Sequence, residues 1–122
     1  MKMQTFREFV EELNKTQIDR VLDKFIPFCC DYLGLKDHPP IKTITGKEAQ
    51  AMKSFGCWDG HEIRLNVDGR HPIDVCRTLA HELVHHAKNH TDGKDGSDDE
   101  NEANALAGTI LRKFGRANPD LF

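Results

Sequence analysis

Two histidines and a glutamate in the second half of the chain have a spacing that suits metal chemistry. They belong to the stretch His81-Glu82-Leu83-Val84-His85, a His-Glu-x-x-His motif. Residues four apart lie one turn apart on the same face of an α-helix, so His81 and His85 can direct two imidazole nitrogens at one point. Glu82 is expected about 100° around the helix, beside the two histidines and not between them.

This arrangement of side chains predicts a hydrolytic zinc site. Two neutral imidazoles are suitable ligands for Zn²⁺, and a catalytic zinc ion keeps one position open for water beside three protein ligands. The ion lowers the pKa of that water and polarises a carbonyl group. Glu82 can take the proton of the water and pass it to a leaving amine, which makes it the candidate general base.

The residues themselves leave the third ligand open. The acidic candidates stand at the start of the last expected helix and are Asp98, Asp99, Glu100 and Glu102. His90 is a further candidate, although it falls one residue short of the third histidine in the metzincin pattern. Helix phase favours Asp99 and Glu100, because Glu102 lies about 100° from the centre of the apolar stripe of that helix. Glu100 could alternatively complete a capping box with Ser97.

The motif and a second segment together resemble the gluzincin metallopeptidases. The first segment is Thr78-Leu79-Ala80-His81-Glu82-Leu83-Val84-His85-His86, and the second is Glu100-Asn101-Glu102-Ala103-Asn104-Ala105-Leu106-Ala107. Over about residues 60–112 the chain most resembles the small peptidases of the ImmA/IrrE type, and in size it resembles the single-domain minigluzincins. The resemblance implies that Glu102 is the third zinc ligand and that the protein hydrolyses peptide bonds in a protein or peptide substrate.

Two other interpretations compete with an active peptidase. A zinc-stabilised regulatory or binding module with little or no intrinsic proteolytic activity is favoured by the short chain, which offers few walls to hold a substrate. Glu82 favours the enzyme, because a purely structural zinc site needs no base. A protease that acts at DNA, like the SprT-type proteins, is disfavoured by a net charge of −3, which gives no general attraction to phosphate backbones.

Hydrophobic periodicity predicts one α+β domain over residues 1–122. Helices are expected over the first 35 residues, a short one at 6–13 and a longer one from Thr16 that Pro27 kinks or divides. A brief strand at 41–45 and a short helix at 47–53 follow. The turn Asp59-Gly60 then predicts a hairpin. It leads into a strand in which Ile63, Leu65 and Val67 alternate with polar residues.

The motif lies on an expected helix from Pro72 to about Asn89, and the candidate glutamates lie on a last helix from about Asp98 to Gly115. The resemblance implies a zincin-like fold, in which a small twisted sheet covers the motif helix and the glutamate helix lies behind it. The strand of Ile63 is a candidate rim of the cleft, to which an extended substrate could add. The tail at 118–122 is a candidate occupant of that cleft.

The remaining features concern the setting of the protein. No apolar run approaches the roughly 18 residues needed to span a bilayer, so no membrane role is expected. The four cysteines are Cys29, Cys30, Cys57 and Cys76, and their spacing predicts reduced thiols in a cytoplasmic protein. Candidates for stabilising an oxyanion are His61, Arg64, His90 and Tyr32.

Overall fold

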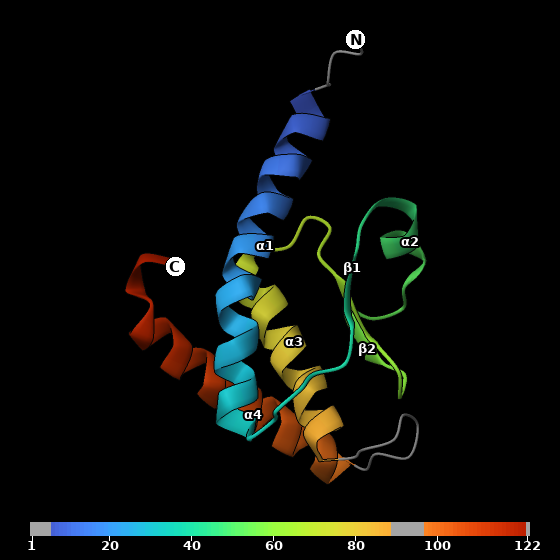
Figure 1. Ribbon diagram of the computed structural model, residues 1–122. Helices are drawn as coiled ribbons and strands as arrows, with labels where there is room; N and C mark the ends of the chain where they lie inside the picture. Colours follow the sequence, from blue (N-terminus) through green and yellow to red (C-terminus); the bar gives the residue numbers. More distant parts are fainter. Residues whose placement is uncertain (1–5, 89–96, 122) are drawn as a thin grey trace.

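The computed structural model describes the backbone of residues 6–88 and 97–121, and the side chains of residues 16–88 and 98–121. In chain order the elements are α1 (Phe6–Leu33), β1 (Ile41–Ile44), α2 (Gly46–Ala51), β2 (Gly56–Trp58), β3 (Ile63–Asn66), α3 (Pro72–Ala87), α4 (Ser97–Ala117) and the 3-10 turn η1 (Pro119–Leu121). Helices and a small mixed sheet share one structure, which confirms the expected α+β class (Figure 1).

Helix α1 is one continuous helix of 28 residues, where two helices were expected. Pro27 lies inside it and removes the backbone hydrogen bond to the carbonyl of Asp23, four residues earlier. Both residues are on the exposed side of the helix, where water can satisfy that carbonyl. Phe25 and Cys29 are fully buried on the opposite side. Core packing on both sides of the proline therefore keeps α1 in one piece.

The sheet has the strand order β1-β3-β2. Strand β3 pairs in parallel with β1, with Ile41 opposite Ile63, and antiparallel with β2, with Trp58 opposite Ile63. Leu65 and Val67 are also buried, as the alternating pattern predicted. Because β3 is paired along both edges, the expectation that it forms a rim open to an extended substrate is wrong.

The expected hairpin is confirmed, and a side chain holds its turn. Oδ1 of Asp59 accepts hydrogen bonds of 2.8 Å from the backbone N–H groups of His61 and Glu62. These two donors hold the pKa of the Asp59 carboxyl below its ordinary value. Gly60 adopts a φ of 93°, a conformation that residues with a Cβ rarely adopt. The turn between β2 and β3 is thus set by Asp59 and Gly60, the two residues that predicted it.

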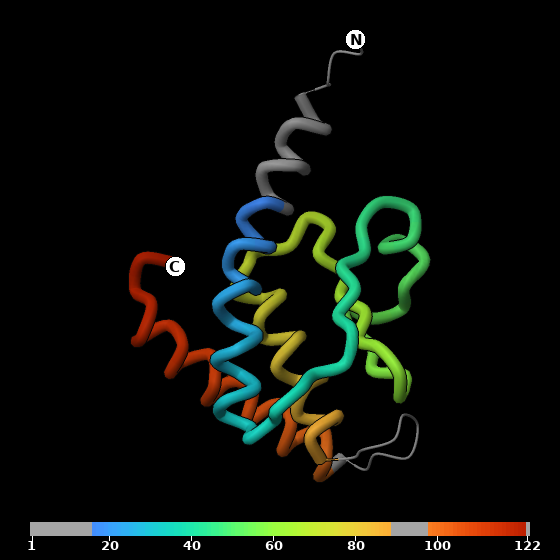
Figure 2. The backbone as a smooth tube through the Cα atoms, in the orientation of Figure 1, coloured from blue at the N-terminus to red at the C-terminus, as the bar shows by residue number. Residues whose placement is uncertain are grey.

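Helix α3 is the central element, since it contacts α1, α4, β2 and β3. It lies between α1 and the sheet, and α4 crosses it (Figure 2). Pro72 occupies its first turn, and Nδ1 of the N-cap residue His71 accepts from the backbone N–H of Ile73 at 3.1 Å. Its fully buried residues are Val75, Cys76, Leu79, Ala80, Leu83 and Val84. Packing on nearly every side fixes the helix that carries the motif.

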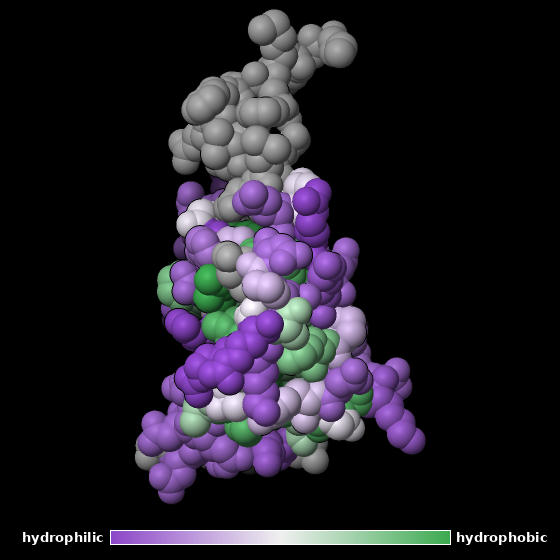
Figure 3. All heavy atoms as spheres, turned by 90° about the vertical axis from the view of Figure 1, so that its left-hand side faces the viewer, coloured by the Kyte–Doolittle hydropathy of each residue, from purple (hydrophilic) through white to green (hydrophobic). Residues whose placement is uncertain are grey.

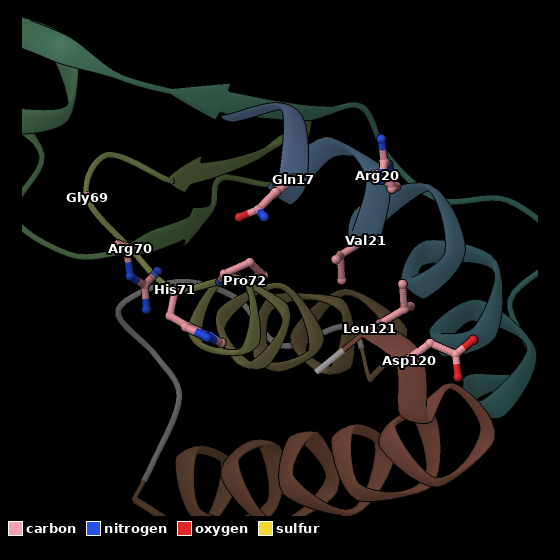
Figure 4. A pocket seen from close by; sticks show the side chains of 9 residues that line it. All are labelled: Gln17, Arg20, Val21, Gly69, Arg70, His71, Pro72, Asp120 and Leu121. Atoms are coloured by element: carbon pink, nitrogen blue, oxygen red, sulfur yellow. The ribbon is translucent and has the colours of Figure 1, made fainter. Parts of the chain in front are cut away.

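Helix α4 extends to Ala117, two residues beyond the expected stop at Gly115, and η1 follows it. Leu121 of η1 packs against the core, and with Val21 and Pro72 it lines a pocket at the N-terminal end of α3 (Figure 4). That end is roughly 14–20 Å along the helix axis from the two motif histidines. Residues 118–121 therefore do not occupy a cleft at the histidines, which corrects the expectation for the tail.

The surface is mainly polar on the side that Figure 3 shows. Hydrophilic side chains dominate this view, and the hydrophobic ones form only small separate patches among them. Within the described residues, no helix is long and apolar enough to cross a membrane.

Candidate metal centre

His81 and His85 lie on the second half of α3 and turn their rings toward each other. Their ring centroids are 4.5 Å apart at an interplanar angle of 80°, and the two Nε2 atoms are 2.9 Å apart. The His85 ring is buried, while the His81 ring is partly exposed. The spacing of four residues therefore brings both imidazole nitrogens to one point, as the motif predicted.

A carboxylate from α4 completes this group. Glu100 places Oε1 at 2.9 Å from Nε2 of His85 and Oε2 at 3.2 Å from Nε2 of His81. Among the side chains that the structure describes, these three form the group of metal-ligand type whose donor atoms all lie within 4.8 Å of one another. Two helices that are separated in sequence thus contribute one cluster of two nitrogens and a carboxylate.

The distances within this cluster can be compared with those of a zinc site. Tetrahedral zinc with bonds of about 2.0–2.1 Å has ligand atoms roughly 3.3–3.4 Å apart. The two Nε2 atoms are 2.9 Å apart, and His85 and His81 lie 2.9 and 3.2 Å from different oxygens of Glu100. With one donor atom taken from each residue, all the separations stay within 4.8 Å. The Glu100 side chain is about half exposed, so the cluster is closed by protein at His85 and open to solvent at the carboxylate. The donor set and its spacing fit a divalent metal.

Glu102, the ligand that the family resemblance implied, lies elsewhere. Its Oε1 is 3.2 Å from Nζ of Lys88, the C-cap residue of α3. The reason is helix phase: Glu100 lies three residues before Ala103 and seven before Ala107, both fully buried, so it shares the inward face of α4. Glu102 lies about 200° around the helix from Glu100. The structure therefore brings Glu100, and not Glu102, to the histidines.

Glu82 is buried beside the cluster, with 8% of its surface exposed. It lies on the side of α3 that faces the sheet, because a Cβ built on Gly56 of β2 would be 3.4 Å from the Cγ of Glu82. The expected position beside the two histidines, outside the ligand group, agrees with this placement. The Glu82 side chain is therefore enclosed where α3 meets β2, unlike an exposed glutamate.

Two further side chains extend the surroundings of the histidines. His86 is half-buried, and its ring packs edge-on against the ring of Trp58 with centroids 4.8 Å apart. Trp58 also packs on the core, which supports a packing role for it.

Among the candidates for oxyanion stabilisation, Arg64 is paired with Glu62 at 2.9 Å. Tyr32 lies beneath Nζ of Lys113.

Several expectations fall outside what the structure describes. His90, the alternative third ligand and oxyanion candidate, belongs to the segment 89–96, and the side chain of Ser97 in the proposed capping box is also outside the described set. The ion pair of Lys88 and Glu102 was not anticipated. Its signal in the sequence is weak, since it consists only of two opposite charges that are 14 residues apart.

The four cysteines are not part of the candidate metal cluster of His81, His85 and Glu100. All four cysteines are free, and Cys29, Cys30 and Cys76 are buried. Burial raises the pKa of both Cys29 and Cys76 to about 12. A thiol acts as a nucleophile or zinc ligand only as the thiolate, so at neutral pH these two are inert core residues.

Comparisons with protein-family models, with curated proteins and with solved structures find no match for this chain. The likeness to gluzincin peptidases therefore rests on the motif residues themselves. The features of this chain that bear on its function are the three ligand-type side chains and Glu82.

Proposed function

We propose that this protein is a zinc-dependent peptidase with a zincin-like fold, in which His81, His85 and Glu100 bind the metal. The observation that carries the proposal is the position of Glu100, whose two oxygens each lie near one Nε2 of the His-Glu-x-x-His pair. A glutamate reaching a histidine pair from a second helix gives the His₂Glu donor set of catalytic zinc sites. The resemblance predicted this donor set but took the glutamate from Glu102.

The donor set favours zinc as the metal. Two imidazole nitrogens and one carboxylate suit Zn²⁺ better than the oxygen-rich sets that Mg²⁺ and Ca²⁺ require. When bound, the zinc ion supplies a Lewis acid that polarises a carbonyl and activates water. Four free cysteines support a reducing, cytoplasmic setting for the protein.

In this proposal the histidines and Glu82 have separate roles. His85 is held rigidly because its ring is buried, and His81 is the more exposed member of the pair. Glu82 accepts a proton from the attacking water and delivers it to the leaving amine, as expected of a buried carboxylate beside the ligands. The open side at Glu100 leaves room for a peptide substrate to approach.

The test combines metal analysis with hydrolysis. Zinc-loaded wild type, Glu82→Gln and Glu48→Gln are incubated with a fluorogenic peptide library. Glu48 is an exposed glutamate on α2, so its variant is the matched control. We expect all three to hold about one zinc ion and Glu82→Gln to lose roughly 10²–10⁴-fold in rate. Full activity in Glu82→Gln would contradict the proposed role of the base.

The competing interpretation predicts a different outcome. If the zinc-loaded wild type cleaves no member of the library and chelation of the metal unfolds it, the protein is a zinc-stabilised module without effective proteolytic activity. Circular dichroism before and after chelation distinguishes this result from simple loss of a catalytic ion.

A further inference from the structure

Strand β2 meets helix α3 at a glycine that has no room for a side chain. A Cβ built on Gly56 would lie 2.5 Å from Cγ2 of Thr78 and 3.4 Å from Cγ of Glu82. Gly56 does not have a positive φ, unlike Gly34, Gly46, Gly60 and Gly69. Its backbone conformation is therefore open to any residue, and the restriction is one of space alone.

The methyl group of Thr78 cannot easily turn away from Gly56. Oγ1 of Thr78 donates to the backbone carbonyl of Asp74 at 3.0 Å and accepts from a guanidinium nitrogen of Arg70 at 3.0 Å. Rotating the side chain to move Cγ2 would break both hydrogen bonds. Arg70 is held in turn by the carbonyl of Asn66 at 3.3 Å and by the ring of Phe55, the neighbour of Gly56.

We propose that Gly56 is a positioning residue for Glu82: its missing side chain lets β2 lie directly on α3 and fixes the Glu82 carboxylate beside the metal ligands. The proposal rests on the proposed function for its catalytic meaning, but the packing that it describes exists without metal or substrate. The three atoms nearest to a Cβ at Gly56 belong to Thr78, Glu82 and Arg64, and none of them belongs to a proposed metal ligand. A substitution there should disturb the base and spare the metal.

The packing is tested with three variants and a matched control. Gly56→Ala should lower the melting temperature by roughly 5–10 °C, because the added methyl overpacks a closed contact. Thr78→Ser removes Cγ2 and keeps Oγ1, so the double variant Gly56→Ala/Thr78→Ser should recover most of the loss. Gly108→Ala is the control, since a Cβ there meets only an ordinary contact of 3.7 Å with Arg112. It should melt at the wild-type temperature or above, because alanine favours a helix.

Positioning of Glu82 is tested without turnover by ¹³C NMR of the side-chain carboxyl groups in the metal-free protein. The Glu82 signal is identified by its absence in Glu82→Gln. We expect this signal to move in Gly56→Ala, to return in the double variant and to stay in place in Gly108→Ala. An unmoved Glu82 signal in a folded Gly56→Ala protein, or a failure of Thr78→Ser to restore the signal, would overturn the proposal.

Hydrolysis supplies the second readout. With zinc-loaded protein, Gly56→Ala should retain the wild-type zinc affinity and KM within about twofold and lose roughly 10–100-fold in kcat, since a displaced base slows the chemical step alone. Equal losses in zinc affinity and kcat would instead indicate general damage and overturn the positioning role. If the wild type itself cleaves nothing, the proposed function fails, and the NMR signal still decides whether Gly56 positions Glu82.

Discussion

Glu100 reaches His85 from a different helix, with Oε1 at 2.9 Å from Nε2. The histidine is buried on α3, and the glutamate is half exposed in the first turns of α4. A buried imidazole needs a polar partner, and His85 finds both the carboxylate and Nε2 of His81. This contact joins the two helices at the candidate metal centre, so the proposed metal site depends on the orientation of α4.

The ion pair of Lys88 and Glu102 is expected to support that orientation. Both side chains are about half exposed, so the pair is worth about 0.2–1 kcal/mol. We expect Glu102→Lys and Lys88→Glu each to weaken zinc affinity by less than about fivefold. The charge-swapped double variant should bind zinc like wild type. Competition with a chromogenic chelator measures the affinities. A large loss in Glu102→Lys that the swap does not repair would identify Glu102 as a ligand.

Arg70 is expected to stabilise the junction between the sheet and α3. Its guanidinium contacts the carbonyls of Asn66 and Asp74 and Oγ1 of Thr78, and it stacks 4.1 Å over the Phe55 ring. Lysine cannot reproduce this forked geometry, so Arg70→Lys should lower the free energy of unfolding by roughly 1–2 kcal/mol in urea titration.

The control for this substitution is Arg77→Lys on helix α3. Arg77 is exposed and has one long contact of 3.9 Å with Asp74. Its replacement should change the free energy of unfolding by less than about 0.5 kcal/mol. Equal effects of the two substitutions would show that the contacts of Arg70 contribute nothing specific.

The buried thiols predict a loss of stability at alkaline pH. Burial raises the pKa of Cys76 from its ordinary value of 9.0 to about 12 in the folded protein. Below pH 9 both states keep the proton and the thiol has no effect. Between about pH 9 and 12 only the unfolded state releases it, so the free energy of unfolding falls by up to about 1.4 kcal/mol per pH unit.

Urea titrations under reducing conditions at a series of pH values measure this effect. The stability of Cys76→Ala should fall less steeply above pH 9 than that of wild type. Parallel curves for wild type and Cys76→Ala would contradict the inference from burial.

Local patterns predicted most of the elements and the part of the candidate site that lies on α3. The apolar stripe of α3 and the alternation in β3 are properties of neighbouring residues, and both elements formed where expected. The continuity of α1 through Pro27 depends on which side of the helix meets solvent, which is a tertiary property. The burial of β3 between two strands depends on the parallel pairing with β1, which no short pattern specifies.

The same distinction applies to the site residues. His81 and His85 lie on one helix, so their spacing alone was sufficient. The third candidate ligand comes from α4, and two predictions of it disagreed. The resemblance indicated Glu102, whereas the phase of α4 favoured Asp99 and Glu100. Phase was the better guide to this placement, because the buried positions Ala103 and Ala107 define which residues of α4 face α3.

The most direct measurement is the zinc content of wild type, Glu100→Ala and Glu102→Ala after reconstitution with zinc and removal of the excess. We expect about one zinc ion per chain in wild type and in Glu102→Ala, and none in Glu100→Ala. Zinc that is lost from Glu102→Ala and retained in Glu100→Ala would contradict the ligand set. A wild type that takes up no zinc would contradict the metal centre itself.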